Sequence, residues 1–195
     1  MGGYLHIFIG IKLGGNMIFA YESLLVKHKV FISYYHHDDQ YYKDYIVTRF
    51  GNQFINKSVN IGEYNSENSD EYIKRLIRED KITDSSVVVV LVGPNTKNRK
   101  HVDWEIYAGL RDSVNSCSGL VGILLPTFSV GYDYTYNLGD LPARLADNVQ
   151  SGFAKVYMWN YAINNFSSII AEAYRNKTLL YLKKRNDRLQ MKWNR

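Results

Sequence analysis

Apolar and polar residues alternate in blocks from about residue 29 onward. Four apolar runs predict buried strands at 29–35, 85–93, 119–126 and 154–159, and a weaker run predicts a fifth strand at 55–62. The run at 85–93, "SSVVVVLVG", carries five valines and a leucine without any alternation between apolar and polar positions. Such a run is typical of a strand that is buried on both faces, as in a parallel sheet.

Amphipathic stretches separate these runs. One stretch places Val102, Ile106 and Leu110 on an inner face around Glu105, which lies in the expected first turn of its helix. Ser69 is a suitable cap for another helix. The predicted helices are 38–51, 70–80, a helix that follows the loop at 94–100 and has Glu105 in its first turn, 141–149 and 164–184. Strands alternating with helices predict a three-layer α/β fold of flavodoxin-like type with a central five-stranded parallel sheet.

Three loops should meet at one edge of this sheet. They are "YYHHDD" at 34–39, "GEYNSENS" at 62–69 and "PNTKNRKHVDWE" at 94–105, and each follows a predicted strand. Ligands of such sheets bind where loops leave the carboxyl ends of the strands. Glu105 ends the third loop, so we expect it to face this crevice.

Charge is concentrated near the C-terminus. Residues 172–195 hold eight Lys or Arg and two acids, a net charge of +6, so the rest of the chain contributes −1 to the total of +5. We interpret this segment as the solvated face of a terminal helix, with an acidic partner, anionic lipid or nucleic acid as alternatives. The expected organisation is an N-terminal extension of unknown role at 1–27, an α/β domain at 28–171 and a basic C-terminal helical segment at 172–195.

The N-terminal extension and the cysteine content bear on location. The extension is apolar, but Lys12, Asn16 and Glu22 interrupt it, so it falls short of the roughly 20 apolar residues of a membrane span and lacks the features of a signal peptide. We therefore expect no membrane partner. Cys117 is the only cysteine, which excludes an intramolecular disulfide and favours a reducing compartment, so we expect a cytoplasmic protein.

The sequence lacks the motifs that mark several classes of nucleotide-binding and hydrolytic enzymes. The chain has no Gly-rich phosphate loop ending in Lys-Ser or Lys-Thr, no G-x-G-x-x-G after the first strand and no G-x-S-x-G elbow. The central strand also ends without the aspartate of a phospho-acceptor domain. "HHDD" at 36–39 has metal-ligand residue types, but adjacent residues rarely converge on one ion, and we expect no metal site. Asp38 or Asp39 is more simply the cap of the next helix.

What remains is one carboxylate among aromatic side chains. Ordinary glycoside hydrolysis needs two acids, because a poor leaving group must be protonated. Cleavage of the nicotinamide–ribose bond of NAD+ needs only one, because the nicotinamide nitrogen is already cationic and leaves as a neutral ring. Glu105 could stabilise the oxocarbenium-like transition state. Tyr34, Tyr35 and Trp104 could stack on the nicotinamide or the adenine.

The motifs around these residues resemble a known family. "KVFISYYHHDD" and "VVVVLVGPNTKNRKHVDWEIYAGL" are similar to the first strand and loop, and to the third strand, loop and helix, of TIR domains. The resemblance is closer to the TIR-like ThsB proteins of the bacterial Thoeris anti-phage system and spans roughly residues 28–165. Its specific part is Gly93 and Thr96 after the strand, the Asn98–Arg99 pair, and Glu105 followed by isoleucine.

The resemblance implies a fold, an activity and a site. It implies a TIR-like domain with Glu105 as the catalytic residue for NAD+ cleavage, with Ser33, Tyr34 and Tyr35 lining the nucleotide pocket. We add His36, Thr96, Arg99 and Trp104 as candidate substrate-binding residues; Arg99 could meet the phosphates of the dinucleotide. The list of candidates is catalytic Glu105 and substrate-binding Ser33, Tyr34, Tyr35, His36, Thr96, Arg99 and Trp104.

The family further implies an anti-phage enzyme. Such a protein converts NAD+, its substrate and not a bound cofactor, into a cyclic or modified ADP-ribose that activates a partner effector, and a phage-derived component triggers it. Nucleic acid is not an expected partner, and a homo-oligomer is among the assemblies left open. The alternatives are a non-catalytic TIR-like module that acts by protein–protein assembly, and an enzyme similar to nucleoside deoxyribosyltransferases. The chain departs from the family pattern at "KHV" before Trp104, where a tryptophan is common, and in its polar second loop.

Overall fold

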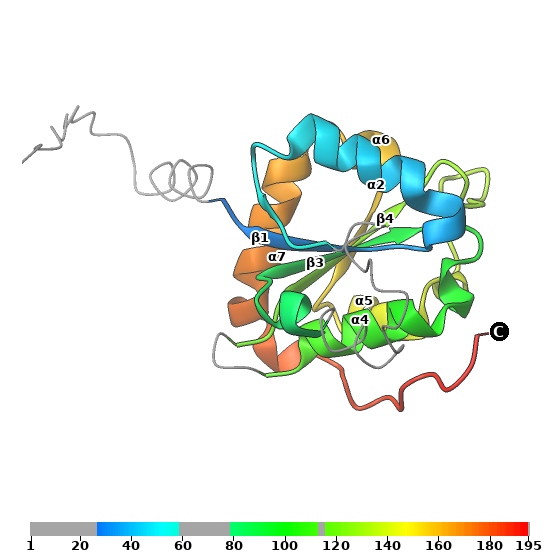
Figure 1. The fold of residues 1–195 in the computed structure, drawn as a ribbon. Helices are drawn as coiled ribbons and strands as arrows, with labels where there is room; N and C mark the ends of the chain where they lie inside the picture. Colours follow the sequence, from blue (N-terminus) through cyan, green and yellow to red (C-terminus); the bar gives the residue numbers. More distant parts are fainter. Residues whose placement is uncertain (1–26, 59–78, 113–115, 195) are drawn as a thin grey trace, which may run out of the picture.

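The computed structural model describes residues 27–58, 79–112 and 116–194 (Figure 1). Within these ranges, five strands form one parallel sheet in the order β2-β1-β3-β4-β5. The sheet confirms the flavodoxin-like α/β fold class and a strand at each of the five predicted runs. The strands are β1 (Lys29–Ser33), β2 (Ile55–Asn56), β3 (Val87–Val92), β4 (Gly119–Leu124) and β5 (Lys155–Met158).

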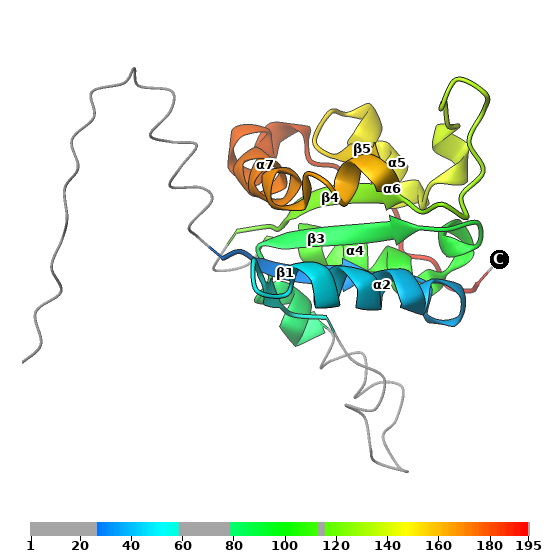
Figure 2. The same ribbon diagram turned by 90° about the horizontal axis from the view of Figure 1, so that it is seen from above.

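Helices cover both faces of the sheet and complete three layers (Figure 1). Helices α2 (His36–Phe50), α6 (Trp159–Ala162) and α7 (Phe166–Leu179) cover one face, with α7 running along β4 (Figure 2). Helices α4 (Lys100–Leu110) and α5 (Ala143–Gln150) cover the other face. Short 3-10 turns are η1 (Thr96–Asn98), η2 (Leu138–Asp140) and η3 (Tyr181–Lys183). The predicted helix at 70–80 and its cap Ser69 lie almost entirely outside the described residues, as does the extension before residue 27.

Strand β3 is the centre of the core, because its successive side chains enter two different layers. Val88, Val90 and Val92 pack in the cluster that holds α4 and α5. Val87, Val89 and Leu91 pack in the cluster under α2 and α7. All six residues of β3 are buried, which explains why its sequence shows no alternation.

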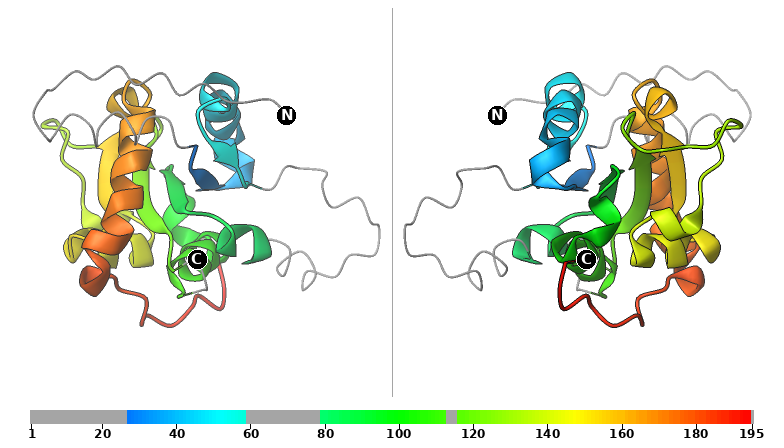
Figure 3. Two further views of the ribbon diagram at one scale, coloured as in Figure 1. Left: turned by 90° about the vertical axis from the view of Figure 1, so that its left-hand side faces the viewer. Right: turned by 90° about the vertical axis from the view of Figure 1, so that its right-hand side faces the viewer.

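The C-terminal segment differs from its prediction. Helix α7 ends at Leu179, and after the turn η3 the chain has no regular structure from 184 to 194. This stretch, which we call the C-terminal strap (residues 184–194), runs along the outer side of α4 and α5 (Figures 1 and 3). The expectation of a solvated terminal helix is therefore wrong for these residues. The physical reason is that buried side chains of α5 take the carbonyls of the strap, which a helix would keep for itself.

Candidate functional site

Glu105 and Ser33 meet at the carboxyl end of β1, although they lie 72 positions apart in sequence. Ser33 is the last residue of β1, and its hydroxyl donates a hydrogen bond of 2.6 Å to Oε2 of Glu105. Both side chains are buried, with exposed fractions of 0 % and 5 %. A short O–H···O⁻ bond in a buried site is charge-assisted and fixes the orientation of the carboxylate. The structure thus brings together two of the residues singled out in the sequence.

Helix α4 starts earlier relative to Glu105 than the sequence suggested. Its first residue is Lys100, so Glu105 lies in the second turn and not in the first. The acid in the first turn is Asp103, whose negative charge is favourable near the positive end of the helix dipole. Val102, Ile106 and Leu110 are buried on the inner face as predicted, and this packing turns Glu105 toward β1.

Tyr34 and Tyr35 divide between core and surface. Tyr34 is 2 % exposed, packs in the core under α2, and donates a hydrogen bond of 2.6 Å to Gln40. Tyr35 is half-buried, and the guanidinium carbon of Arg99 lies 3.9 Å from the centre of its ring. That distance is a close cation–π contact. Adjacent residues at a strand end point to opposite sides, so only one of the two tyrosines is available to a ligand.

Two histidines extend the surface around Tyr35. The His36 ring lies 4.3 Å from that of Tyr34 and 5.9 Å from that of His101. His101 also places Nε2 3.2 Å from the backbone oxygen of Tyr34, which ties the start of α4 to the end of β1. We call Tyr35, His36, Arg99 and His101 the Tyr35 cluster. No pattern in the sequence indicated His101, because its position in the cluster depends on how α4 approaches the end of β1.

Asp39 and Thr96 form a second buried pair beside this edge. The expectation that Asp38 or Asp39 caps the next helix is wrong: α2 begins at His36 after Tyr35, and no side chain caps it. Asp39 is 1 % exposed, Thr96 donates a hydrogen bond of 3.2 Å to it, and Thr96 accepts one of 2.8 Å from the Gly93 backbone. Burial raises the pKa of Asp39 to about 6.

These contacts give Gly93 and Thr96, two residues of the family motif, structural roles. A side chain at Gly93 would place its Cβ only 2.5 Å from Oδ1 of Asp39, so this position needs glycine for close approach. Thr96 is fully buried and is the first residue of η1, in the loop between β3 and α4. Its visible role is to hold this loop against α2. The structure therefore gives Thr96 internal partners for its hydroxyl.

Trp104 contacts the C-terminal strap. Its indole N–H donates a hydrogen bond of 2.9 Å to the backbone oxygen of Met191, and the Lys100 ammonium lies 5.1 Å from its ring. Trp104 was predicted from the sequence to bind the substrate, whereas in the structure its indole N–H binds the backbone of the strap at Met191.

Asp103 and Arg144 form a buried ion pair that was not predicted from the sequence. Arg144 is 0 % exposed, and its Nε lies 3.0 Å from Asp103, which is also buried. The same guanidinium donates to the backbone oxygens of Asn186 and Arg188, and Asp103 accepts from the backbone N–H of Met191 at 2.8 Å. An arginine in a short amphipathic helix looks solvent-exposed in sequence, so nothing in the pattern indicated this pair.

Within residues 27–58, 79–112 and 116–194, no group of three or more His, Cys, Asp or Glu side chains is arranged to hold a metal ion. None of the helices described is both long and apolar enough to cross a membrane. The groups at this edge of the sheet are the oriented carboxylate of Glu105, the hydroxyl of Ser33, the buried Asp39, and the aromatic and cationic side chains of the Tyr35 cluster.

The sheet order defines a flavodoxin-like domain, with a buried carboxylate held at the end of β1. The family model described as "Thoeris protein ThsB, TIR-like domain" matches residues 31–129, and the chain belongs to this family. The match includes Ser33, the Tyr35 cluster and Glu105, which confirms the resemblance seen in the motifs.

Other comparisons add little. Among solved structures, the chain is similar to the TIR domains in the structure of the activated Roq1 resistosome directly recognizing the pathogen effector XopQ. The identity is 10 %, the TM-score is 0.38, and the alignment covers 76 % of this chain and 84 % of that one. No curated protein matches the chain.

Proposed function

We propose that this protein cleaves NAD+ at the nicotinamide–ribose bond, with Glu105 as the catalytic residue. The observation that carries the proposal is the 2.6 Å hydrogen bond from Ser33 to Glu105, which fixes a buried carboxylate at the edge of the sheet where ligands of this fold bind. The product is an ADP-ribose derivative, cyclic or modified, that activates a partner effector during phage defence. We expect the reaction to take place in the cytoplasm.

The proposed reaction needs little from the protein beyond charge and position. The bond between the nicotinamide nitrogen and the anomeric carbon breaks, and its electron pair neutralises the cationic ring nitrogen. The carboxylate of Glu105 stabilises the positive charge that develops on the ribose. Water, or a nucleophile within the ADP-ribose in the case of a cyclic product, then bonds to the anomeric carbon and loses a proton.

The Tyr35 cluster is suited to the rest of the dinucleotide. The half-buried ring of Tyr35 stacks with the ring of His37 at 5.9 Å, and a planar ring of the ligand can take the place of this exposed histidine. Arg99 packs on that ring and keeps a guanidinium at the rim of the site, where it can pair with a phosphate. His36 and His101 complete the cluster on the α2 and α4 sides.

The burial of Glu105 adds a condition to the proposal. At 5 % exposure, the carboxylate is covered, and ribose reaches it only after the surroundings open. The family resemblance implies activation by a phage component, and a closed resting site is consistent with such control. We therefore expect the resting protein to consume NAD+ slowly.

The test uses cells that are challenged with phage. Cells that express wild type, Glu105→Gln or Glu172→Gln are compared by mass spectrometry for NAD+ and ADP-ribose derivatives. Glu172 is a matched control, because it is also a hydrogen-bonded glutamate but lies on α7. We expect a new ADP-ribose species with wild type and Glu172→Gln, and none with Glu105→Gln. Identical profiles for all three folded proteins, with a phage that the system resists, would refute the enzymatic function.

A second candidate function is a non-catalytic assembly module. The specific observation in its favour is again the exposure of 5 %, because a covered, hydrogen-bonded glutamate can also be a structural residue. In that case, Glu105→Gln lowers the stability of the protein and leaves nucleotide levels unchanged, while protection from phage depends on surface residues.

A further inference from the structure

The C-terminal strap is fastened to the body by polar contacts along most of its length. Asn148 donates a hydrogen bond of 2.7 Å to the backbone oxygen of Arg185 and accepts one of 2.9 Å from its N–H. At the other end, the side chain of Asn194 accepts a hydrogen bond of 2.9 Å from the backbone N–H of Lys100, the first residue of α4. The strap is thus a fixed wall on the outer side of α4 and α5.

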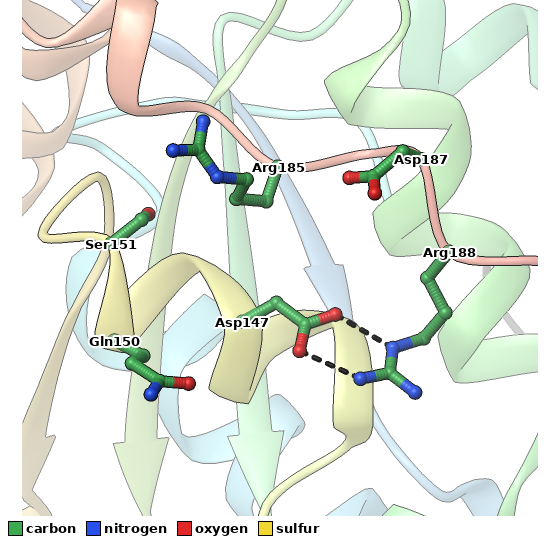
Figure 4. A pocket seen from close by; sticks show the side chains of 6 residues that line it. All are labelled: Asp147, Gln150, Ser151, Arg185, Asp187 and Arg188. Carbon is green, nitrogen blue, oxygen red and sulfur yellow. Dashed lines mark hydrogen bonds and ion pairs between the residues drawn. The ribbon is translucent and has the colours of Figure 1, made fainter.

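Two hollows lie along this wall. The smaller, about 560 Å³, is lined by the six residues drawn in Figure 4, and its acids and bases balance: Arg188 forms a two-bond fork with Asp147, and Arg185 and Asp187 add one charge of each sign. A cavity with such balanced charge favours neither an anion nor a cation. The larger hollow shares only Arg188 with the smaller one.

The larger hollow lies between the strap, the turns η1 and η2, and the start of α4. Its volume is about 960 Å³, at the upper end of the roughly 300–1,000 Å³ of small-molecule sites. Three bases and one acid line it, namely Lys97, Arg188, Lys192 and Asp103. The acid is neutralised, because Asp103 is 3.0 Å from the buried Arg144. Arg188 is paired in the same way with Asp147, and Lys97 with Asp140, so Lys192 alone leaves the wall and its partners with a net charge of +1, which suits an anion.

Lys97 and Lys192 can both reach a ligand, but Lys97 must first leave an ion pair. Lys97 lies 2.6 Å from Asp140 at the surface, a type of pair that exchanges partners at little cost. Lys192 is exposed and, within the part of the chain that the structure describes, has no ion-pair partner. An ammonium of this kind is a flexible point charge that can follow a phosphate.

The remaining wall offers a flat ring and amide groups. Trp193 is 78 % exposed and lines the cavity, so its indole face is open to stacking. Gln190 also lines the cavity, and its buried Nε2 has no hydrogen-bond partner in the structure. An unpaired buried donor costs free energy that a ligand acceptor would recover. Asn98 and Asn194 supply further donors and acceptors.

We propose that this cavity is a binding site for a nucleotide, with the base stacked on Trp193 and the phosphates held by Lys97 and Lys192. A nucleotide combines the anionic group, the planar ring and the acceptor-rich edges that these wall residues match. The site is separate from Glu105 and Ser33, neither of which lines it. The proposal therefore does not depend on the NAD+-cleaving activity.

The test measures binding of ADP to the full chain by isothermal titration calorimetry. We expect saturable binding that weakens about tenfold in Lys192→Gln and in Trp193→Ala, since stacking and one charge contact are each lost. Lys183→Gln is the matched control, because this lysine precedes the strap and lines neither hollow. Adenosine and pyrophosphate are expected to bind more weakly than ADP, because each supplies half of the recognition. All substitutions are at exposed side chains, and circular dichroism verifies the fold.

Three results would overturn the proposal. One is the absence of saturable ADP binding up to millimolar concentration. Another is an equal loss with Lys183→Gln, or a loss with Arg99→Ala, which would assign the ligand to the general basic charge or to the Tyr35 cluster. The third is pyrophosphate binding as tightly as ADP, which would remove the ring from the recognition and leave a simple anion site.

Discussion

At the scale of single residues, the hydrogen bond between Ser33 and Glu105 is the contact on which the proposed chemistry depends. The carboxylate is covered by the fold and accepts the bond of the serine at 2.6 Å, so its direction is set before any substrate arrives. Preorganisation of this kind is the largest contribution that a single charged group makes to stabilising a cationic transition state.

The variant Ser33→Ala tests this preorganisation. A hydrogen bond to a charged group contributes about 1.5–3 kcal/mol, so NAD+ consumption in the activated system should fall about tenfold or more. The measurement is the rate of NAD+ loss after phage challenge. Ser167→Ala is the control, because Ser167 also donates to a side-chain oxygen, that of Gln53, from α7. An unchanged rate in Ser33→Ala would show that the bond is only structural.

Asp39 gives a residue-scale prediction about pH. Burial raises its pKa from 3.8 to about 6, so the folded chain holds this proton more tightly than the unfolded chain does. The contribution of Asp39 to stability is therefore most favourable below about pH 4 and is lost as the pH rises through about 6, by about 3 kcal/mol. The neighbouring charge of Asp38 acts in the same direction, and the hydroxyl of Thr96 opposes it.

The variant Asp39→Asn removes this ionisation. Its free energy of unfolding should rise relative to wild type between pH 4 and pH 7, as measured by urea unfolding at several pH values. Asp44→Asn on the same helix is exposed and should show no such trend. A difference between Asp39→Asn and wild type that stays constant across this range would contradict the assignment.

At the scale of elements, the buried pair of Asp103 and Arg144 joins α4, α5 and the strap. Arg144→Met leaves Asp103 buried without its cation, and removing one partner of a buried pair costs about 3–5 kcal/mol. Arg188→Met breaks an exposed fork to Asp147 on the same surface and should cost below about 1 kcal/mol. Chemical denaturation of both variants checks the contrast, and equal losses would contradict it.

The elements also show what the sequence could and could not predict. The valines of β3 and the spacing of Val102, Ile106 and Leu110 predicted a buried strand and the buried face of a helix, because burial leaves a periodic trace. The predicted start of α4 was one turn too late, so the prediction placed Glu105 in the first turn of the helix and not in the second. Polar pairs such as Asp103 with Arg144, and Asp39 with Thr96, leave no periodic trace, since the partners are far apart in the chain.

At the scale of the whole molecule, the strap ties the last described residues to the first turn of α4. The ties are the hydrogen bonds of Met191 to Asp103 and Trp104 and that of Asn194 to Lys100. The charge pattern indicated a basic segment but not its course, because an irregular chain held by side chains of other elements has no signature of its own.

A chain that stops after Lys183 tests the role of the strap. The sheet and its core do not include strap residues, so the fold should persist. The first turn of α4 loses its partners, and its amide hydrogens should exchange much faster, while those of β3 and β4 keep their protection. Hydrogen-exchange mass spectrometry resolves the two regions. Unchanged exchange in α4, or global unfolding, would contradict a role confined to this helix.

Buried Arg144 of α5 also limits which substitutions the protein tolerates at this position and at Asp103. Asp103 and Arg144 each become costly without the other, whereas an apolar pair of similar volume in both places costs little. Substitutions at the two positions are therefore acceptable mainly when they occur together. Co-variation of this kind is itself a record of contact, so a set of related sequences would carry the docking of α5 on α4 as a correlated pair of columns.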